Sequence, residues 1–376
     1  MRKTNCKVNG KAMYRIRTRI GSDITGKAIY KNFYGIGKKE AEEKYNSYIE
    51  AKVNGRIDER STLGQLAKHY TYQVLLNEDL APGTIELYER QYRKLFAVSD
   101  LSIIPAADVT KPMMQAYING LPVDLSDSAK SNLVKYLKKF YIWLENEGYC
   151  ANVMTGISTK KSERKKFEKI SVFSEDEVKK IVSGDSSNRL YVAFVLALAT
   201  GLREGELLGL KYSDLSEDNV VVNKQVNSHY KIEQDGYRSF TTEVKSTKTN
   251  TSKRTVPLPP NVKGLLAEQK LKHKEEMMRN NYRTDYVFTT TTGTLIDKGN
   301  FHRAWNRFLR SAGIAQRKFH SCRATYCTML CKKGIPLETA SKLMGHSNIN
   351  VTAKYYRFVG SDEMQKAAES INGMFG

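Results

Sequence analysis

The feature that most constrains the fold is an uninterrupted apolar run, Leu190 to Ala199. The run is too short to cross a bilayer, which takes about 18 or more apolar residues. It therefore predicts a buried helix at the centre of a domain. Arg203 follows this run almost at once, and the segment EGELLGL then resumes a helical pattern. An arginine at the end of a buried helix is well placed to bind phosphate, although a salt bridge with Glu204 or Glu206 is the alternative interpretation.

Length and charge indicate a multidomain protein with a polyanionic partner. The chain has 376 residues, enough for two or three domains. Lys and Arg total 61 against 40 Asp and Glu, a net charge of +21, which favours nucleic acid over a membrane surface because neutralised phosphates release counterions. The N-terminus MRKTNCKVNGK has no apolar core and is not a secretory signal. Five scattered cysteines, an odd number, indicate reduced thiols in a cytoplasm.

Residues 1–60 have the pattern of a small basic module. KAMYRIRTRI alternates with a period of two and places Arg15, Arg17 and Arg19 on one face of a strand. AIYKNFYGI predicts a further strand, and residues 38–52 predict a helix. The open face is either an ordinary solvated sheet surface or a ribbon that lies in a DNA groove.

Residues 61–158 carry four segments with helical spacing. Leu133, Leu137, Phe140 and Leu144 form one apolar stripe, and Pro82, Thr110 and Ser126 are helix-start signals. The opposite faces carry basic residues that contact either solvent or DNA phosphates, among them Lys135, Lys138 and Lys139. Residues 159–171, which include Lys165, hold six Lys or Arg against two Glu and predict an exposed basic linker.

Four motifs in the C-terminal half combine side chains that suit phosphate chemistry. The first contains Arg203, and the second is STKTNTSKRTVPL, which predicts a strand and turn around Lys248. The third is His320-x-x-Arg323, whose two side chains share one helical face and can converge on one phosphate. The fourth places Tyr355 nine residues after His346.

Together these motifs resemble the signature of the tyrosine recombinases, the phage integrase family. The resemblance implies a multidomain, mainly α fold with small β-sheets: an arm-site DNA-binding domain (1–60) with a three-stranded sheet and a helix, a helical core-binding domain (61–158), a linker (159–171) and an α+β catalytic domain (172–376). The chain departs from the family pattern at Cys322 and Ala324, which flank Arg323. We interpret both departures as changes in packing.

The resemblance also implies the catalytic roles. Arg203 and Arg323 would bind the scissile phosphate, with Lys248 as the acid, His320 as the base, His346 as a further donor and Tyr355 as the nucleophile. On residue chemistry alone Lys245, Lys253 and Arg254 rival Lys248, and Tyr356 rivals Tyr355. The spacing of Cys322, Cys327 and Cys331 does not match a metal-binding knuckle.

The implied activity is site-specific recombination of double-stranded DNA through a 3′-phosphotyrosyl intermediate, without metal or nucleotide cofactor. The resemblance further implies a homotetramer on paired DNA sites, joined by the C-terminal tail (357–376), and an accessory DNA-bending or excision factor. No membrane partner is expected. The alternatives are a type IB topoisomerase and a DNA-binding regulator without catalytic activity.

Overall fold

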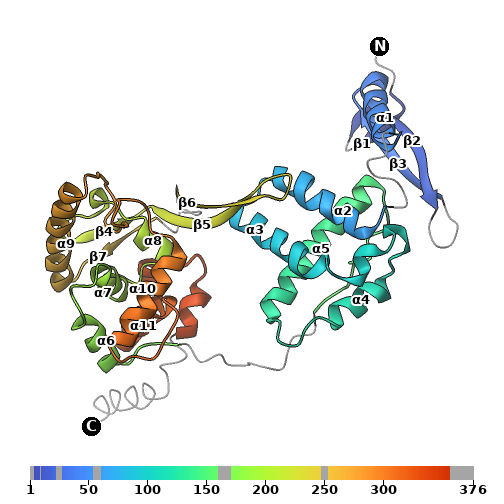
Figure 1. The fold of residues 1–376 in the computed structure, drawn as a ribbon. Coiled ribbons are helices and arrows are strands. Elements are labelled where there is room, and N and C mark those ends of the chain that lie inside the picture. The colour runs from blue at the N-terminus through green and yellow to red at the C-terminus, as the bar shows by residue number, and fades with distance from the viewer. Residues whose placement is uncertain are drawn as a thin grey trace, which may run out of the picture. The chain divides into compact units, whose positions relative to one another are not determined.

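The computed structural model describes residues 4–8, 10–22, 28–53, 61–159, 171–246 and 253–355. The chain forms two compact units (Figure 1). Unit 1 comprises Met1–Lys166 and His229–Ser239, and unit 2 comprises Phe167–Ser228 and Phe240–Gly376. Both units consist mainly of helices with small sheets, which confirms the predicted fold class.

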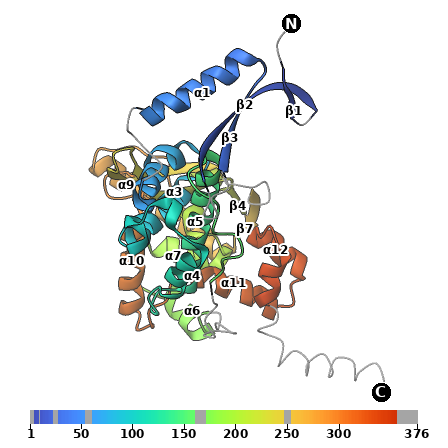
Figure 2. The same ribbon diagram turned by 90° about the vertical axis from the view of Figure 1, so that its right-hand side faces the viewer.

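Unit 1 begins with an antiparallel three-stranded sheet in the order β1-β2-β3, with α1 beside it (Figure 2). The alternation in β2 is as predicted, because Arg15, Arg17 and Arg19 are exposed. Phe33 on β3 is buried against Tyr45 and Tyr48 of α1, with ring centroids 5.6 and 5.2 Å away. The elements are β1 (Cys6–Val8), β2 (Lys11–Ser22), β3 (Ala28–Gly35) and α1 (Lys38–Val53).

The helical part of unit 1 packs around α5, whose predicted apolar stripe is fully buried. Thr110 and Ser126 cap α4 and α5 by accepting hydrogen bonds from the backbone, and Pro82 begins α3, as predicted. π-helical turns extend α2 and α3 over residues Tyr70–Val74 and Tyr92–Phe96. The α-helices are α2 (Leu63–His69), α3 (Pro82–Gln91), α4 (Lys111–Asn119) and α5 (Asp127–Glu147).

A hairpin tip distant in sequence completes the core of unit 1. Strands β5 (Lys224–Ile232) and β6 (Arg238–Ser246) pair with each other, and the tip between them belongs to unit 1. Ile232 joins the helical core, and Arg238 forms an ion pair with the fully buried Glu89. Strand β6 was not predicted from the sequence, because its mostly polar residues give no clear alternation.

Unit 2 is built around α7, where all residues except Ala199 are buried, and this confirms the predicted central helix (Figure 1). The ring of Phe194 lies 5.7, 5.0 and 5.0 Å from the rings of Phe301, Trp305 and Phe308. The helices are α6 (Glu175–Val182), α7 (Tyr191–Thr200), α8 (Glu204–Leu208), α9 (Pro260–Arg279), α10 (Lys298–Ser311), α11 (His320–Lys332) and α12 (Leu337–Met344), and the paired strands are β4 (Asn219–Val222) and β7 (Arg254–Pro257).

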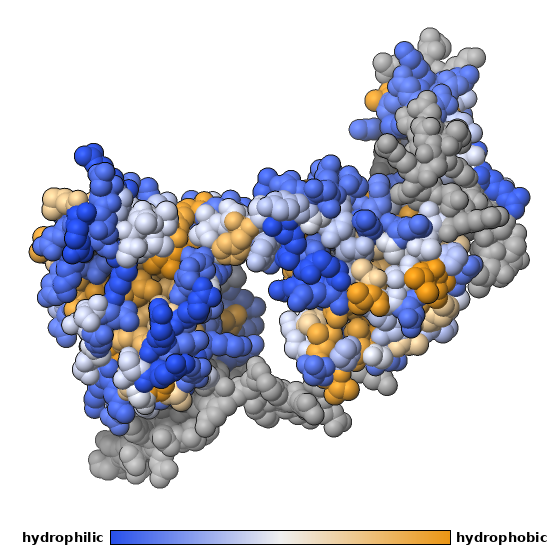
Figure 3. Space-filling model, viewed as in Figure 1, coloured by the Kyte–Doolittle hydropathy of each residue, from blue (hydrophilic) through white to orange (hydrophobic). Residues whose placement is uncertain are grey.

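Polar side chains cover much of the visible face of both units, and apolar patches interrupt them (Figure 3). Among the described residues, no helix is both long and apolar enough to span a membrane.

Candidate active site

The C-terminal end of α7 positions Arg203. Gly201 ends the helix with a φ of 65°, and a Cβ atom at this position would lie 2.4 Å from Cδ1 of Tyr326. Only glycine fits both constraints. Arg203 then precedes α8 and donates from Nη1 to Oε1 of Glu206 (2.7 Å) and from Nη2 to the carbonyl of Gly345 (2.9 Å). The alternative ion pair with Glu206 therefore exists, but it holds the arginine with about a third of its side chain exposed.

Arg323 lies on α11, which packs against α7. It is 2% exposed and donates from Nη1 to the carbonyl of Gly201 (2.7 Å) and from Nη2 to the carbonyl of Met344. Burial and the nearby Arg203 lower the pKa of Arg323 to about 9, so the side chain remains charged at neutral pH. These bonds use two of the five N–H groups of the guanidinium, and the remaining groups can bind a phosphate. The flanking Cys322 and Ala324 are buried, as expected for packing positions.

A buried carboxylate, Glu206, lies between two arginines. Arg254 donates from Nη1 and Nη2 to the two oxygens of Glu206 (3.0 and 2.8 Å), and Arg203 binds the same carboxylate. Burial alone would raise the pKa of Glu206, but the bonds and charges of Arg254 and Arg203 outweigh it and lower the pKa to about 2. This role of Glu206 was not predicted from the sequence, in which Arg254 was only a rival to Lys248. Nothing in the sequence shows that α8 and β7 meet.

His346 lies just beyond α12, where Gly345 ends the helix with a φ of 62°. Its Nδ1 is 2.7 Å from Oγ1 of the fully buried Thr352. Burial, followed by the charges of Arg323 and Arg203, lowers the pKa of His346 to about 4. His346 is therefore neutral at physiological pH, and it can donate a hydrogen bond only through the ring nitrogen that carries the proton.

His320 begins α11 and is exposed at its surface. Partial loss of hydration and the charges of Arg323 and Arg203 lower its pKa below the ordinary 6.5. The imidazole is therefore largely neutral at pH 7 and can accept a proton.

Tyr355 lies at the end of a helical segment, residues 349–355, and is half-buried. It packs against the cluster of Cys327, Cys331 and Met344, so the two cysteines lie on a packed face of α11. Burial and Cys327 raise the pKa of Tyr355, whereas the charge of Arg323 lowers it. The hydroxyl is therefore protonated at neutral pH and requires a base for nucleophilic attack.

Five of the six predicted catalytic residues thus gather around one site. The charges of Arg203, Arg323 and His320 act on His346, and the charge of Arg323 acts on Tyr355. The sixth residue, Lys248, and the rival nucleophile Tyr356 lie outside the described residues. Of the rivals to Lys248, Lys245 pairs with Glu243 and Lys253 is exposed.

The predicted DNA-binding residues lie in unit 1 or outside the described residues. Arg17 stacks over the ring of Tyr30 at 4.0 Å on the cationic face of β2. Lys135 and Lys138 are exposed on α5. Lys139 forms an ion pair with Glu78, so it is a weaker candidate for a phosphate contact than its two neighbours. Lys165 falls in the undescribed segment 160–170.

Two arginines, two histidines and a tyrosine thus lie together in an α+β unit, and side chains of these kinds suit the cleavage and rejoining of a phosphodiester. Residues 171–359 match the phage integrase family, and the chain belongs to this family of tyrosine-type site-specific DNA recombinases. It is 36% identical to a "Tyrosine recombinase XerC-like" of Caldanaerobacter subterraneus subsp. tengcongensis, over 100% of this chain and 99% of that protein. It is 24% identical to the integrase of Mycobacterium phage D29, over 77% of this chain and 73% of the phage protein.

Solved structures with the same fold include two integrases in complex with DNA. The Tn1549 transposon integrase bound to a circular intermediate DNA superposes with a TM-score of 0.62 at 21% identity, over 82% of this chain and 99% of that one. A lambda integrase dimer bound to a core site superposes with a TM-score of 0.57 at 18% identity, over 95% of both chains. The family assignment favours a recombinase over a topoisomerase or a non-catalytic regulator.

Proposed function

We propose that this recombinase integrates and excises a mobile element or phage genome by cleaving and rejoining DNA strands with Tyr355. The observation that carries the proposal is the convergence of Arg203 and Arg323 near the half-buried Tyr355. A phosphodiester repels nucleophiles, so its charge must be neutralised before attack. Two guanidinium groups with unused N–H donors supply this neutralisation and stabilise the pentacoordinate transition state.

In the proposed cleavage step, Oη of Tyr355 attacks the scissile phosphorus and the bond from phosphorus to the 5′ oxygen breaks. His320 accepts the phenolic proton, and Lys248 donates a proton to the departing 5′ oxygen. His346 donates a hydrogen bond to a non-bridging oxygen. The 3′-phosphotyrosyl bond retains the energy of the phosphodiester, so a 5′-hydroxyl of a second strand can reverse the steps without a nucleotide cofactor or a metal ion.

The proposed organisation assigns DNA arm sites to residues 1–60 and the core site to residues 61–158 and 172–376, joined by the basic linker 159–171. The cationic face of β2, with Arg15, Arg17 and Arg19, would contact the arm DNA. Lys135, Lys138, Lys139 and Lys165 would contact phosphates of the core site. We further propose a homotetramer on paired sites in the bacterial cytoplasm, assembled through the C-terminal tail and assisted by an accessory DNA-bending or excision factor.

A suicide substrate tests the proposed nucleophile. A duplex from the ends of the mobile element, nicked near the crossover point, traps the covalent complex because the cleaved fragment diffuses away. Tyr355→Phe should abolish the complex while binding DNA with a dissociation constant within about twofold of wild type, since only one hydroxyl is lost. Tyr356→Phe is the matched control and should form the complex.

The reverse result, attachment by Tyr355→Phe and none by Tyr356→Phe, would contradict the assignment. The same assay in excess chelator tests the metal-free scheme. Cleavage should persist there, and a strict requirement for a divalent cation would refute this part of the proposal.

A further inference from the structure

Three consecutive backbone carbonyls at the end of α12 each accept a hydrogen bond from a different arginine. Leu343 accepts from Nε of Arg254 (2.8 Å), Met344 accepts from Arg323, and Gly345 accepts from Arg203 (2.9 Å). The last carbonyls of a helix lack intrahelical partners and carry partial negative charge, so cations stabilise them. The three arginines therefore hold the turn that leads into His346.

Two of these arginines, Arg203 and Arg323, are the proposed phosphate ligands, and the third has a different environment. The side chain of Arg254 is buried like that of Arg323, with 6% of it exposed, whereas the side chain of Arg203 is 35% exposed. The Nε, Nη1 and Nη2 atoms of Arg254 all donate to protein groups, whereas within the described part of the chain Arg323 donates only from Nη1 and Nη2. Arg254 is therefore poorly placed to contact DNA itself.

We infer that Arg254 is a positioning residue for strand cleavage, which holds Arg203 through Glu206 and His346 through the carbonyl of Leu343. This inference rests on the proposed function. Glu206 accepts from both Arg254 and Arg203, so the carboxylate fixes one arginine relative to the other. On its other side Arg254 anchors the helix end that directs His346 into the site.

The planar fork of arginine is essential to this arrangement. Two N–H groups bind the carboxylate of Glu206 side by side, while Nε reaches a carbonyl in another direction. A lysine carries the same charge on a single nitrogen and cannot reproduce the bidentate pair and the carbonyl bond together. The fit is also close, since a Cβ atom at Gly345 would lie 3.0 Å from Cδ and from Nη1 of Arg254.

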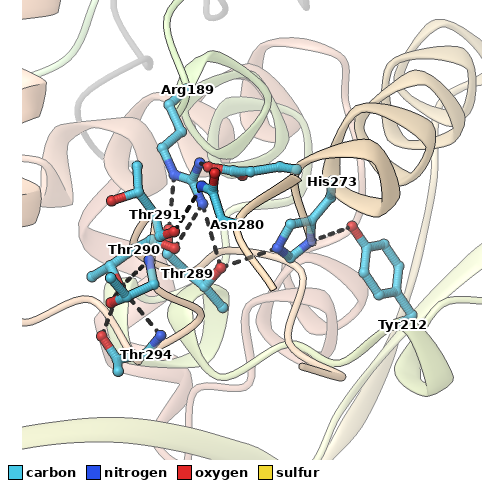
Figure 4. Close-up of polar contacts among 10 residues, drawn as sticks. Arg189, Tyr212, His273, Asn280, Thr289, Thr290, Thr291 and Thr294 are labelled. Carbon is cyan, nitrogen blue, oxygen red and sulfur yellow. Dashed lines mark hydrogen bonds and ion pairs between the residues drawn. The ribbon is translucent and has the colours of Figure 1, made fainter. Parts of the chain in front are cut away.

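Arg189 provides a matched control in the same unit (Figure 4). It too binds a carboxylate, Glu276, and donates to backbone carbonyls, those of Thr289 (3.0 Å) and Thr290 (2.9 Å). Its hydrogen-bond and ion-pair partners in the described part of the chain, which include Glu276, Thr289 and Thr290, are not among the proposed catalytic residues. Arg189→Gln therefore removes a structural arginine of the same kind without disturbing the catalytic site.

The experiment compares Arg254→Lys, Arg254→Gln and Arg189→Gln with wild type in single-turnover cleavage of the suicide substrate at saturating protein, with DNA affinity measured separately. We expect both Arg254 variants to cleave at least about 100-fold more slowly, with dissociation constants within about twofold of wild type. Arg189→Gln should lower the melting temperature but cleave within about threefold of wild type.

A double-mutant cycle tests whether Arg254 acts through Glu206. If it does, the loss of cleavage rate in Arg254→Lys combined with Glu206→Gln should be clearly smaller than the product of the two single losses, with the contact to Leu343 accounting for the part of the Arg254 loss that remains. Independent, multiplying losses would overturn the inference, as would a wild-type cleavage rate for Arg254→Lys or an equal loss for Arg189→Gln. Absence of a covalent complex with wild-type protein would overturn the proposed function as well, whereas the other three results leave that function intact.

Discussion

Replacing Glu206 with glutamine should destabilise unit 2 by an amount that depends on pH. The carboxylate is 1% exposed and is the shared acceptor of Arg203 and Arg254. The substitution keeps the size of the side chain and removes its charge. It therefore leaves the buried side chain of Arg254 and the partly exposed Arg203 without their shared counter-ion.

The size of this destabilisation follows from the pKa of Glu206. Folding lowers the pKa of Glu206 from an ordinary 4.5 to about 2. One pKa unit corresponds to about 1.4 kcal/mol, so ionised Glu206 stabilises the fold by about 3 kcal/mol at pH 7. Because the folded pKa lies below the unfolded one, this stabilisation is fully present above about pH 4.5 and is lost as the pH falls through about 2. At pH 3 roughly half of it should remain.

The chain has two tryptophans, and their positions allow the unfolding of unit 2 to be followed separately by fluorescence. Trp305 is buried in the core of unit 2, and Trp143 packs in unit 1. In a Trp143→Phe background, the fluorescence of Trp305 reports the unfolding of unit 2 by urea. The difference in unfolding free energy between this parent and its Glu206→Gln variant should be about 3 kcal/mol at pH 7 and should shrink on acidification. A difference below about 1 kcal/mol at pH 7, or one that is constant between pH 7 and pH 3, would refute the reasoning.

Three further predictions concern the turn around His346 and the proposed base. Gly345→Ala should destabilise unit 2 by about 1–2 kcal/mol in thermal unfolding and should slow cleavage, because the alanine would have a positive φ and its Cβ would press against Arg254. Gly334→Ala is the control: it places alanine at a similar positive φ, but no atom of the described residues beyond its chain neighbours lies within 4 Å of the added Cβ, so this variant should cleave normally. Thr352→Val should slow single-turnover cleavage about tenfold, the equivalent of one hydrogen bond to His346, and an unchanged rate would count against this contact. Between pH 6 and 8, His346 should not titrate in the cleavage profile, since its pKa is about 4. A loss of rate on acidification should instead come from protonation of His320, whose pKa lies below the ordinary 6.5 because of burial and the nearby arginines, and should be absent in His320→Asn.

Local patterns in the sequence determined most of the secondary structure. The apolar run of α7, the alternation of β2 and the stripe of α5 each follow from the periodicity of a single element. The same holds for the caps Thr110 and Ser126, because the bonds that they accept come from residues three positions away. Motif spacing likewise singled out the five proposed catalytic residues that the structure gathers, from Arg203 to Tyr355.

Only the tertiary structure revealed which groups share one site. Glu206 and Arg254 are 48 residues apart, and the acceptors of the three arginines at the end of α12 are backbone carbonyls, which leave no mark in the sequence. The sequence likewise gives no sign that the hairpin tip with Ile232 packs in the core of unit 1. Periodicity reports the environment along one element, whereas a buried ion pair or a capped helix end depends on elements that meet only when the chain is folded.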